Sequence, residues 1–299
     1  MEKKTIIDLF ESSAKRFPSN PFLWEKTGKR FEPTTYAEVR DLVYEEGAGL
    51  ISLGVRKGDN MALLSEGRNA WIIGELAMFY AGATNVPLSI KLEEANDLLF
   101  RLVHADVKYI MVSGQQLKKI RAIKDKLPAV RKIIVLDEQA EYQDREMSLS
   151  EICRMGKVYL GIHPIEEFLA IGQSLGNDDY ATITYTSGTT ADPKGVILTN
   201  RNYMAYVGDT PAGPLLRPRG RILHLHVEGS LGSYRAGRAY RYGDLEEYPY
   251  QYKGVQAVPD TERPRLGEEL QEEYRARYPS ARQERRPPFQ PSLTDRLYL

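Results

Sequence analysis

Apolar strand patterns alternate with amphipathic helix patterns along most of this chain, and this alternation restricts its fold more than any other feature. Short runs rich in aliphatic residues predict strands at residues 60–65, 84–89, 108–113, 132–137 and 180–187. Helical periodicity lies between them, at residues 69–82, 92–107 and 116–127. We therefore predict an α/β fold, in which helices cover both faces of a layered, largely parallel sheet.

Two further helices are predicted near the N-terminus from capping boxes. Thr5 with Asp8, and Thr35 with Glu38, each place a hydroxyl residue three positions before an acidic one. The second helix should stop at Gly54, because glycine is the usual residue just beyond a helix end. The predicted apolar faces consist of Ile6, Leu9, Phe10, Ala14 and Phe17 in the first helix, and of Val39, Leu42, Val43 and Leu50 in the second.

The most apolar stretch, residues 71–88, predicts a buried helix followed by a strand. Glu75, Pro87 and two glycines interrupt it, and a bilayer-spanning helix needs roughly 20 clean apolar residues. Residues 138–179 have a less regular pattern. Residues 196–207 begin as a strand and should pass into a helix near Asn200.

Composition excludes several classes of protein. The 41 basic and 41 acidic side chains cancel, so we expect small-molecule partners and no nucleic acid. Cys153 is the single cysteine, and the first residues lack the pattern of a signal peptide, so we expect a cytoplasmic protein. The four histidines have no metal-ligand spacing, and we predict no metal site.

Residue usage changes after about Tyr206. Residues 1–206 contain 15 Lys, 11 Arg and 17 Ile, whereas residues 207–299 contain 1 Lys, 14 Arg and 1 Ile. We therefore divide the chain into residues 1–206 and an atypical tail of residues 207–299.

Three interpretations of this tail compete. An RNA-binding segment is opposed by its net charge of only +2, from 15 basic and 13 acidic side chains. A disordered linker is the second, and a translation in a shifted reading frame is the third. Residues 242–280, read one nucleotide later with synonymous codons chosen freely, permit the segment "KPSLILSVPALAKNFRKNIE", a strand followed by a basic helix. We favour the shifted frame over disorder, and both over an independent folded domain.

The stretch "YTSGTTADPKGV", residues 185–196, concentrates hydroxyl groups after a predicted strand. Strand ends in open parallel sheets are the usual ligand-binding positions. Gly188 and Gly195 allow close approach of the backbone and positive φ, and Lys194 adds a positive charge. Successive backbone N–H groups and hydroxyls suit a phosphate, although the same residue types also form plain polar turns.

The stretch resembles the phosphate loop of the adenylate-forming (AMP-binding) superfamily. Within that superfamily, the chain is most similar to bacterial long-chain fatty acid–CoA ligases. Residues 35–88 resemble the first helix and strand units of the family, so the likeness runs from about Thr5 to Tyr206. Ala191 stands where the family usually has glycine, which puts the conformation of that turn in doubt. The segment permitted by the shifted frame also resembles a family segment downstream of the loop.

The resemblance implies the incomplete N-terminal part of an adenylate-forming enzyme fold. Its reaction would activate a fatty acid with ATP and Mg²⁺ to an acyl-adenylate, and coenzyme A would then take the acyl group. The residues that would bind the β- and γ-phosphates of ATP, carried over by position, are Thr186, Ser187, Gly188, Thr189, Thr190, Lys194 and Gly195.

Motifs that the family carries later in its sequence are not recognisable in this chain. They bind adenine, magnesium and the ribose hydroxyls, and they supply a hinge and a C-terminal lysine. We therefore expect a truncated ligase that makes no acyl-CoA alone, and we assign no catalytic residue. A noncatalytic ATP- or phosphate-binding module is the alternative, and peripheral membrane contact stays open.

Overall fold

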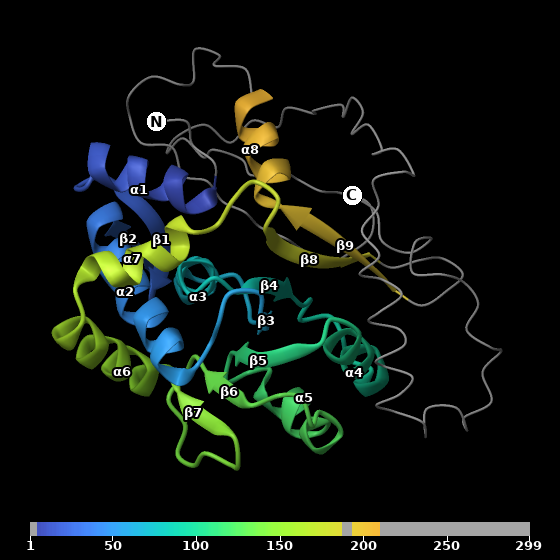
Figure 1. Cartoon of the computed structure of the whole chain (residues 1–299). Coiled ribbons are helices and arrows are strands. Elements are labelled where there is room, and N and C mark those ends of the chain that lie inside the picture. The colour runs from blue at the N-terminus through green and yellow to red at the C-terminus, as the bar shows by residue number, and fades with distance from the viewer. Residues whose placement is uncertain (1–4, 187–192, 210–299) are drawn as a thin grey trace, which may run out of the picture.

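The computed structural model describes residues 5–186 and 193–209 of the chain, with side chains to residue 205. Its larger sheet has seven strands in the order β7-β6-β5-β3-β4-β8-β9 (Figure 1). Neighbouring strands are parallel except β8 and β9, which are antiparallel. The strands are β3 Asn60–Leu64, β4 Thr84–Pro87, β5 Val107–Val112, β6 Lys132–Val135, β7 Glu146–Ser148, β8 Tyr180–Thr186 and β9 Lys194–Thr199.

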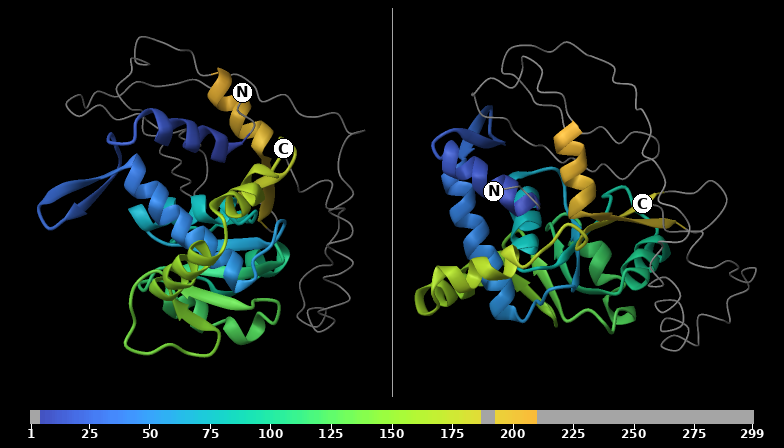
Figure 2. Two further views of the ribbon diagram at one scale, coloured as in Figure 1. Left: turned by 60° about the vertical axis from the view of Figure 1, so that its left-hand side comes forward. Right: turned by 45° about the horizontal axis from the view of Figure 1, so that its top comes forward.

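Helices cover both faces of this sheet, so the predicted fold class is confirmed (Figures 1 and 2). Along β3, Met61 and Leu63 enter the core cluster that includes α1, α2, α3, α6 and α7, whereas Ala62 and Leu64 enter the cluster that includes α4 and α5. The helices are α1 Ile6–Arg16, α2 Tyr36–Leu53, α3 Asn69–Tyr80, α4 Ala95–His104, α5 Leu117–Arg121, α6 Leu149–Ile162, α7 Ile165–Gln173 and α8 Asn200–Asp209.

Both predicted capping boxes are present. The Thr5 hydroxyl accepts a hydrogen bond from the Asp8 amide at 3.2 Å, and the Thr5 amide donates to the Asp8 carboxylate at 3.1 Å. Thr35 and Glu38 form the same pair of bonds. The second helix ends as predicted, with Gly54 at a φ of 102°. The prediction that Leu42 belongs to the buried face of α2 is wrong, because Leu42 lies at the edge of that face and is 38% exposed.

Two other expectations about elements change. The predicted helix at residues 116–127 is divided into α5 and a 3₁₀ turn, Lys124–Lys126. The break brings Ile123 and Leu127 into the same core as Ile120, and the Arg145 guanidinium donates to the carbonyl oxygens exposed there. A second, two-stranded sheet, β1 Pro21–Thr27 and β2 Arg30–Thr35, was not predicted.

The stretch 138–179, irregular in its sequence pattern, contains β7, α6 and α7. Helix α6 crosses α2 with backbone against backbone. A Cβ atom at Gly156 would overlap the carbonyl oxygen of Glu45, and one at Gly49 would overlap the carbonyl oxygen of Ile152. Glycine is therefore required at this crossing for its lack of volume.

The α2 side chain Glu46 is buried beside the same crossing. Its Oε2 atom has no hydrogen-bond partner among the described residues. Burial raises the pKa of Glu46 to about 8, with a smaller contribution from Glu45. Burial, followed by the charges of Glu46 and Glu45, also raises the pKa of the Cys153 thiol on α6 to about 12. Both groups therefore favour their neutral forms.

We predict that Gly156→Ala destabilises the fold by about 3 kcal/mol, because the added methyl group forces α6 away from α2. The matched control is Gly161→Ala in the same helix, where nothing lies within 4 Å of the position that the added Cβ atom would take. That change should stabilise the protein by up to about 1 kcal/mol, through helix propensity. Urea denaturation followed by circular dichroism measures the free energy of unfolding of both variants. Equal changes in the two variants would contradict the close backbone contact between α6 and α2.

We also predict that Glu46 makes the protein less stable as the pH rises. The unfolded carboxyl loses its proton near its ordinary pKa of 4.5, whereas the folded one keeps its proton up to about 8. The free energy of unfolding should therefore fall between these pH values, by a total on the order of 5 kcal/mol. Glu46→Gln should remove the Glu46 part of this slope and leave the smaller part that comes from Glu75, whereas Glu94→Gln, at an exposed position, should leave the whole slope unchanged. Chemical denaturation at several pH values tests this.

Candidate functional site

The flanks of the hydroxyl-rich loop are paired strand residues. Strand β8 ends at Thr186 and β9 begins at Lys194, and these two residues are direct cross-strand partners. The next pair inward is Tyr185 with Gly195. The structure thus brings together three of the predicted site residues, Thr186, Lys194 and Gly195. Cβ atoms of a direct pair such as Thr186 and Lys194 are about 5 Å apart. Ser187, Gly188, Thr189 and Thr190 lie outside the described residues, as does Ala191.

The loop leaves the sheet at the carboxyl end of a parallel strand. Thr182 of β8 pairs with Asn85 of β4, so β8 runs in the same direction as β4, β3, β5 and β6. The ends of these strands share one edge of the sheet, which is where open α/β sheets bind ligands. Strand β9 then returns antiparallel to β8, as the outermost strand in the order of the described sheet (Figure 1).

The lack of a side chain at Gly195 leaves room for its neighbours on β8. The φ of Gly195 is not among the positive values found for described glycines, so Gly195 does not use the positive φ that glycine allows. A Cβ atom there would lie 3.3 Å from Cγ2 of Ile183 and 3.5 Å from the ring of Tyr185. The absent side chain lets the Tyr185 ring lie close against the β9 backbone.

Tyr185, the residue before the loop, is fastened to helix α4. Its hydroxyl lies 2.7 Å from Nδ1 of His104, and it donates to the carbonyl oxygen of Arg101 at 3.3 Å. The His104 ring meets the Tyr185 ring edge to face and stacks on Phe100. Burial raises the pKa of Tyr185 far above its usual range, and the Arg101 charge lowers it less, so the hydroxyl keeps its proton. Strand β8 is thereby held on the α4 side, one residue before Thr186.

The other face of β8 carries threonines. Thr182 shares a 2.8 Å hydrogen bond with the Tyr203 hydroxyl of α8. Its strand partner Asn85 donates to the Glu75 carboxyl of α3 at 2.6 Å. Burial raises the pKa of Glu75 to about 7, and the bond from Asn85 partly offsets this. Polar bonds therefore connect β4 and β8 to α3 and α8 on the face opposite Tyr185.

A second polar group, which was not predicted from the sequence, lies at the ends of β3, β5 and β6. The Arg68 guanidinium donates to Asp137 at 2.7 Å, and the Gly114 amide donates to the same carboxylate at 2.7 Å. Burial alone would raise the pKa of Asp137, but the Gly114 and Arg68 bonds lower it overall. Gln116 donates to Glu66 at 2.6 Å. Its signal in the sequence was a polar or charged residue within four positions of each strand end: Glu66 and Arg68 after β3, Gln116 after β5 and Asp137 after β6.

Metal ligands do not converge within the part of the chain that the structure describes. No group of three or more His, Cys, Asp or Glu side chains there is placed to hold an ion. Among the same residues, no helix is long and apolar enough to cross a membrane.

The family model described as AMP-binding enzyme matches residues 10–226. The chain therefore belongs to the AMP-binding enzyme family, as its loop predicted. The match continues past Tyr206, where the change of residue usage begins.

Curated relatives are acyl-CoA ligases. Acyl-CoA ligase 891, peroxisomal, of Penicillium roqueforti is 31% identical over 228 residues, which cover 68% of this chain and 32% of that protein. Long chain acyl-CoA synthetase 8 of Arabidopsis thaliana is 28% identical over 228 residues, which cover 67% of this chain and 31% of that protein. The chain thus spans about a third of the length of these relatives.

Solved structures share the fold. The anthranilate CoA ligase AuaEII, in complex with anthranoyl-AMP, has a TM-score of 0.56 at 21% identity, covering 70% of this chain and 37% of that one. A long-chain-fatty-acid-CoA ligase from Archaeoglobus fulgidus has a TM-score of 0.54 at 20% identity, covering 68% of this chain and 38% of that one.

We predict that Tyr185→Phe costs about 1–2 kcal/mol of stability, because the Arg101 carbonyl and His104 then lose their bond to the buried hydroxyl. Tyr142→Phe is the control, because Tyr142 is an exposed side chain whose hydroxyl donates a hydrogen bond to Glu138. Loss of that exposed bond should cost less than about 0.5 kcal/mol. Urea denaturation of both variants provides the comparison. Equal costs would mean that the hydrogen bonds from the Tyr185 hydroxyl to helix α4 do not stabilise the protein.

Proposed function

We propose that residues 1–206 form the triphosphate-binding part of a long-chain fatty acid–CoA ligase. The observation that carries this proposal is the pairing of Thr186 with Lys194 at the carboxyl end of β8. The pairing fixes both ends of the hydroxyl-rich loop and sets a positive side chain opposite a hydroxyl. Membership of the AMP-binding family and the acyl-CoA ligase names of the relatives support it.

The proposed role of the loop is to hold the β- and γ-phosphates of ATP. Lys194 would bring a charge-assisted hydrogen bond, which is roughly twice as strong as a neutral one. The hydroxyls and backbone N–H groups of residues 186–190 would surround the remaining phosphate oxygens. Because β8 is bonded to α4 through Tyr185, this array starts from a fixed strand end, and electrostatic stabilisation by fixed groups needs no reorganisation during the reaction.

The whole reaction would proceed in two transfers. The fatty acid carboxylate attacks the α-phosphorus of ATP, pyrophosphate leaves, and an acyl-adenylate forms. The thiol of coenzyme A then attacks the acyl carbon, and AMP leaves. In this scheme, the loop of this chain binds the pyrophosphate leaving group. The described residues hold no metal-binding carboxylate cluster at β8, so we propose that Mg²⁺ arrives with ATP, bound mainly by its phosphates and water.

The chain by itself lacks recognisable parts of the family's catalytic machinery. The chain spans about a third of the relatives' length, and the motifs that the family carries later in its sequence are not recognisable in it. We propose that it makes no acyl-CoA by itself. A noncatalytic ATP- or phosphate-binding module is the second candidate, favoured by the same paired loop ends. The cytoplasmic location stays a prediction.

Residues 207–299 remain best explained, in our proposal, by a change of reading frame. The family match ends at residue 226, which favours a change near that position over one at residue 206. The nucleotide sequence of this region in independent isolates tests the proposal, and an unbroken frame encoding the same tail in active relatives would exclude it.

We predict that the purified chain binds MgATP and that Lys194→Ala weakens binding about tenfold or more, through the loss of a charge-assisted bond. Lys132→Ala, at the start of β6, is the matched control and should leave the affinity unchanged. Isothermal titration calorimetry gives the dissociation constants, and chromatography of acyl-CoA products monitors turnover. Absence of binding in the folded chain would refute the nucleotide site, and robust acyl-CoA formation would refute the proposed inactivity.

A further inference from the structure

The β1–β2 hairpin projects from the layered body of the protein. Figure 2 shows it standing away from the helices and the larger sheet, and it forms a sheet of its own. Its root is in the core, where Phe22 and Leu23 are buried and the Phe22 ring stacks on Tyr36 with centroids 4.4 Å apart. The hairpin is therefore held to the body of the protein by its buried first residues, while its outer part is exposed.

The two faces of this hairpin differ in chemistry. Cross-strand partners share a face, and residues two apart on one strand do so as well. Trp24 pairs with Pro33 and Lys26 pairs with Phe31, which gives one aromatic and basic face. Glu25 pairs with Glu32 on the reverse face, so the acidic groups are kept apart from it. Phe31 is 62% exposed.

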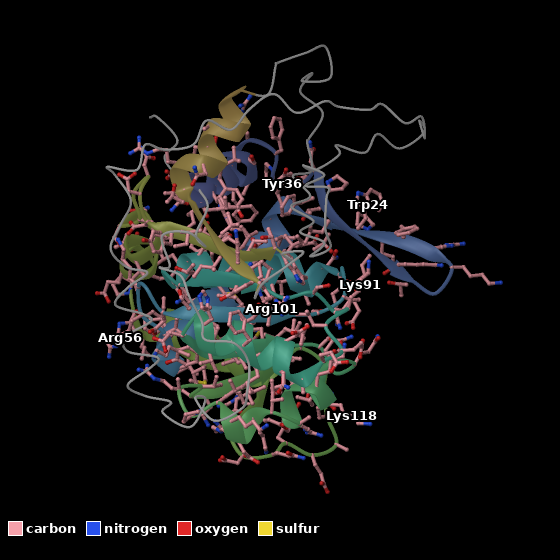
Figure 3. The ribbon with its side chains drawn as sticks, turned by 90° about the vertical axis from the view of Figure 1, so that its right-hand side faces the viewer. Trp24, Tyr36, Arg56, Lys91, Arg101 and Lys118 are labelled. Carbon is pink, nitrogen blue, oxygen red and sulfur yellow. The ribbon has the colours of Figure 1, made fainter. Side chains whose placement is uncertain are left out.

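The tip of the hairpin is basic. Gly28, with a φ of 62°, forms the turn and is followed by Lys29 and Arg30. Across residues 5–186 and 193–205, no ion pair joins Lys26, Lys29 or Arg30 to an acidic group. Lys26 and Lys29 therefore lie near the exposed Phe31 ring, whereas Arg30, the partner of Thr27, is on the reverse face. Figure 3 shows Trp24 on this hairpin, with the strands extending beyond it.

We propose that this hairpin docks the protein on an anionic lipid bilayer. The Phe31 ring enters the headgroup region, and Lys26 and Lys29 lie against the negative lipid headgroups. Aromatic side chains favour this interface, and basic residues near it are attracted by the surface potential of anionic lipids. The acidic reverse face, with Glu25 and Glu32, points away from the bilayer and sets the orientation. The proposal stands independently of the nucleotide site.

A single exposed phenylalanine would need no explanation, since such residues are common on soluble proteins. The hairpin differs because Trp24, Lys26 and Phe31 share one face, while both acidic groups, together with Arg30, occupy the other. That separation matches a negatively charged plane.

The size of the face favours a bilayer over a protein partner. Two strands are about 10 Å wide, and a six-residue strand is about 20 Å long, so the face covers roughly 200 Å². A stable protein interface takes about 800 Å² from each partner. A bilayer sets no such minimum, because a few inserted side chains and basic groups suffice for reversible binding.

The experiment is co-sedimentation of the full 299-residue chain with phosphatidylcholine vesicles, with and without phosphatidylserine. Binding should require phosphatidylserine and should weaken as salt is added, because salt screens the attraction. Trp24 and Trp71 are the two tryptophans, and Trp71 is buried in the core. In a Trp71→Phe background, brominated lipids should therefore quench Trp24 emission on binding.

Surface variants identify the face. The double change Lys26→Gln and Lys29→Gln should weaken binding about 25-fold, at about fivefold for each charge. Phe31→Ser should weaken it about fivefold or more. The matched controls are Lys118→Gln on α5, well apart from Trp24 in Figure 3, and Val158→Ser on α6, where Val158 is 57% exposed. Both controls should bind as the parent chain does. Circular dichroism verifies that every variant is folded.

Three results would overturn the proposal. They are equal binding to neutral and anionic vesicles by the folded chain, no binding to either, and hairpin variants that bind as well as the controls. Concentration-dependent self-association that Phe31→Ser abolishes, without vesicle binding, would assign the face to a second copy of the chain instead.

Discussion

Apolar side chains on both faces of the larger sheet require helices on both sides, and the remaining architecture follows from this constraint. On β3, successive residues alternate between the two core clusters. The chain meets the requirement by passing from one face to the other as it adds strands. On the more heavily covered face, α6 can approach α2 only because glycines remove the side chains between their backbones.

Local signals allowed the strands and several helices to be predicted from the sequence. The capping boxes at Thr5 and Thr35 depend on residues three apart, and the apolar runs of β3, β5 and β6 are continuous. Helix α6 escaped prediction because part of its buried surface is backbone at Gly156, which adds nothing to apolar periodicity. The β1–β2 hairpin escaped because charged residues and Pro33 fill its exposed positions, so its strands resemble a loop in composition.

Part of the candidate site could be predicted from the sequence, and part could not. A strand followed by hydroxyl-rich residues predicted its position, and the structure pairs Thr186 with Lys194 at the two ends of that segment. The supports of the site were not predictable. His104 and Tyr185 are distant in sequence, and each residue type has many ordinary roles, so only the folded arrangement connects α4 to the loop. Asn85 and Thr182, central in the polar bonds beneath β8, likewise meet only through strand pairing.

The strand order has a consequence for the folding pathway. Strands β3, β5, β6 and β7 extend the sheet in one direction, whereas β8 must close against β4 from far along the chain, where Asn85 meets Thr182. Closing so long a segment carries an entropic cost before any contact compensates it, and topologies rich in such pairings fold slowly. The strand that carries the loop should therefore join a sheet whose other half is already assembled, and the edge from which the hydroxyl-rich loop leaves should be among the last parts to mature.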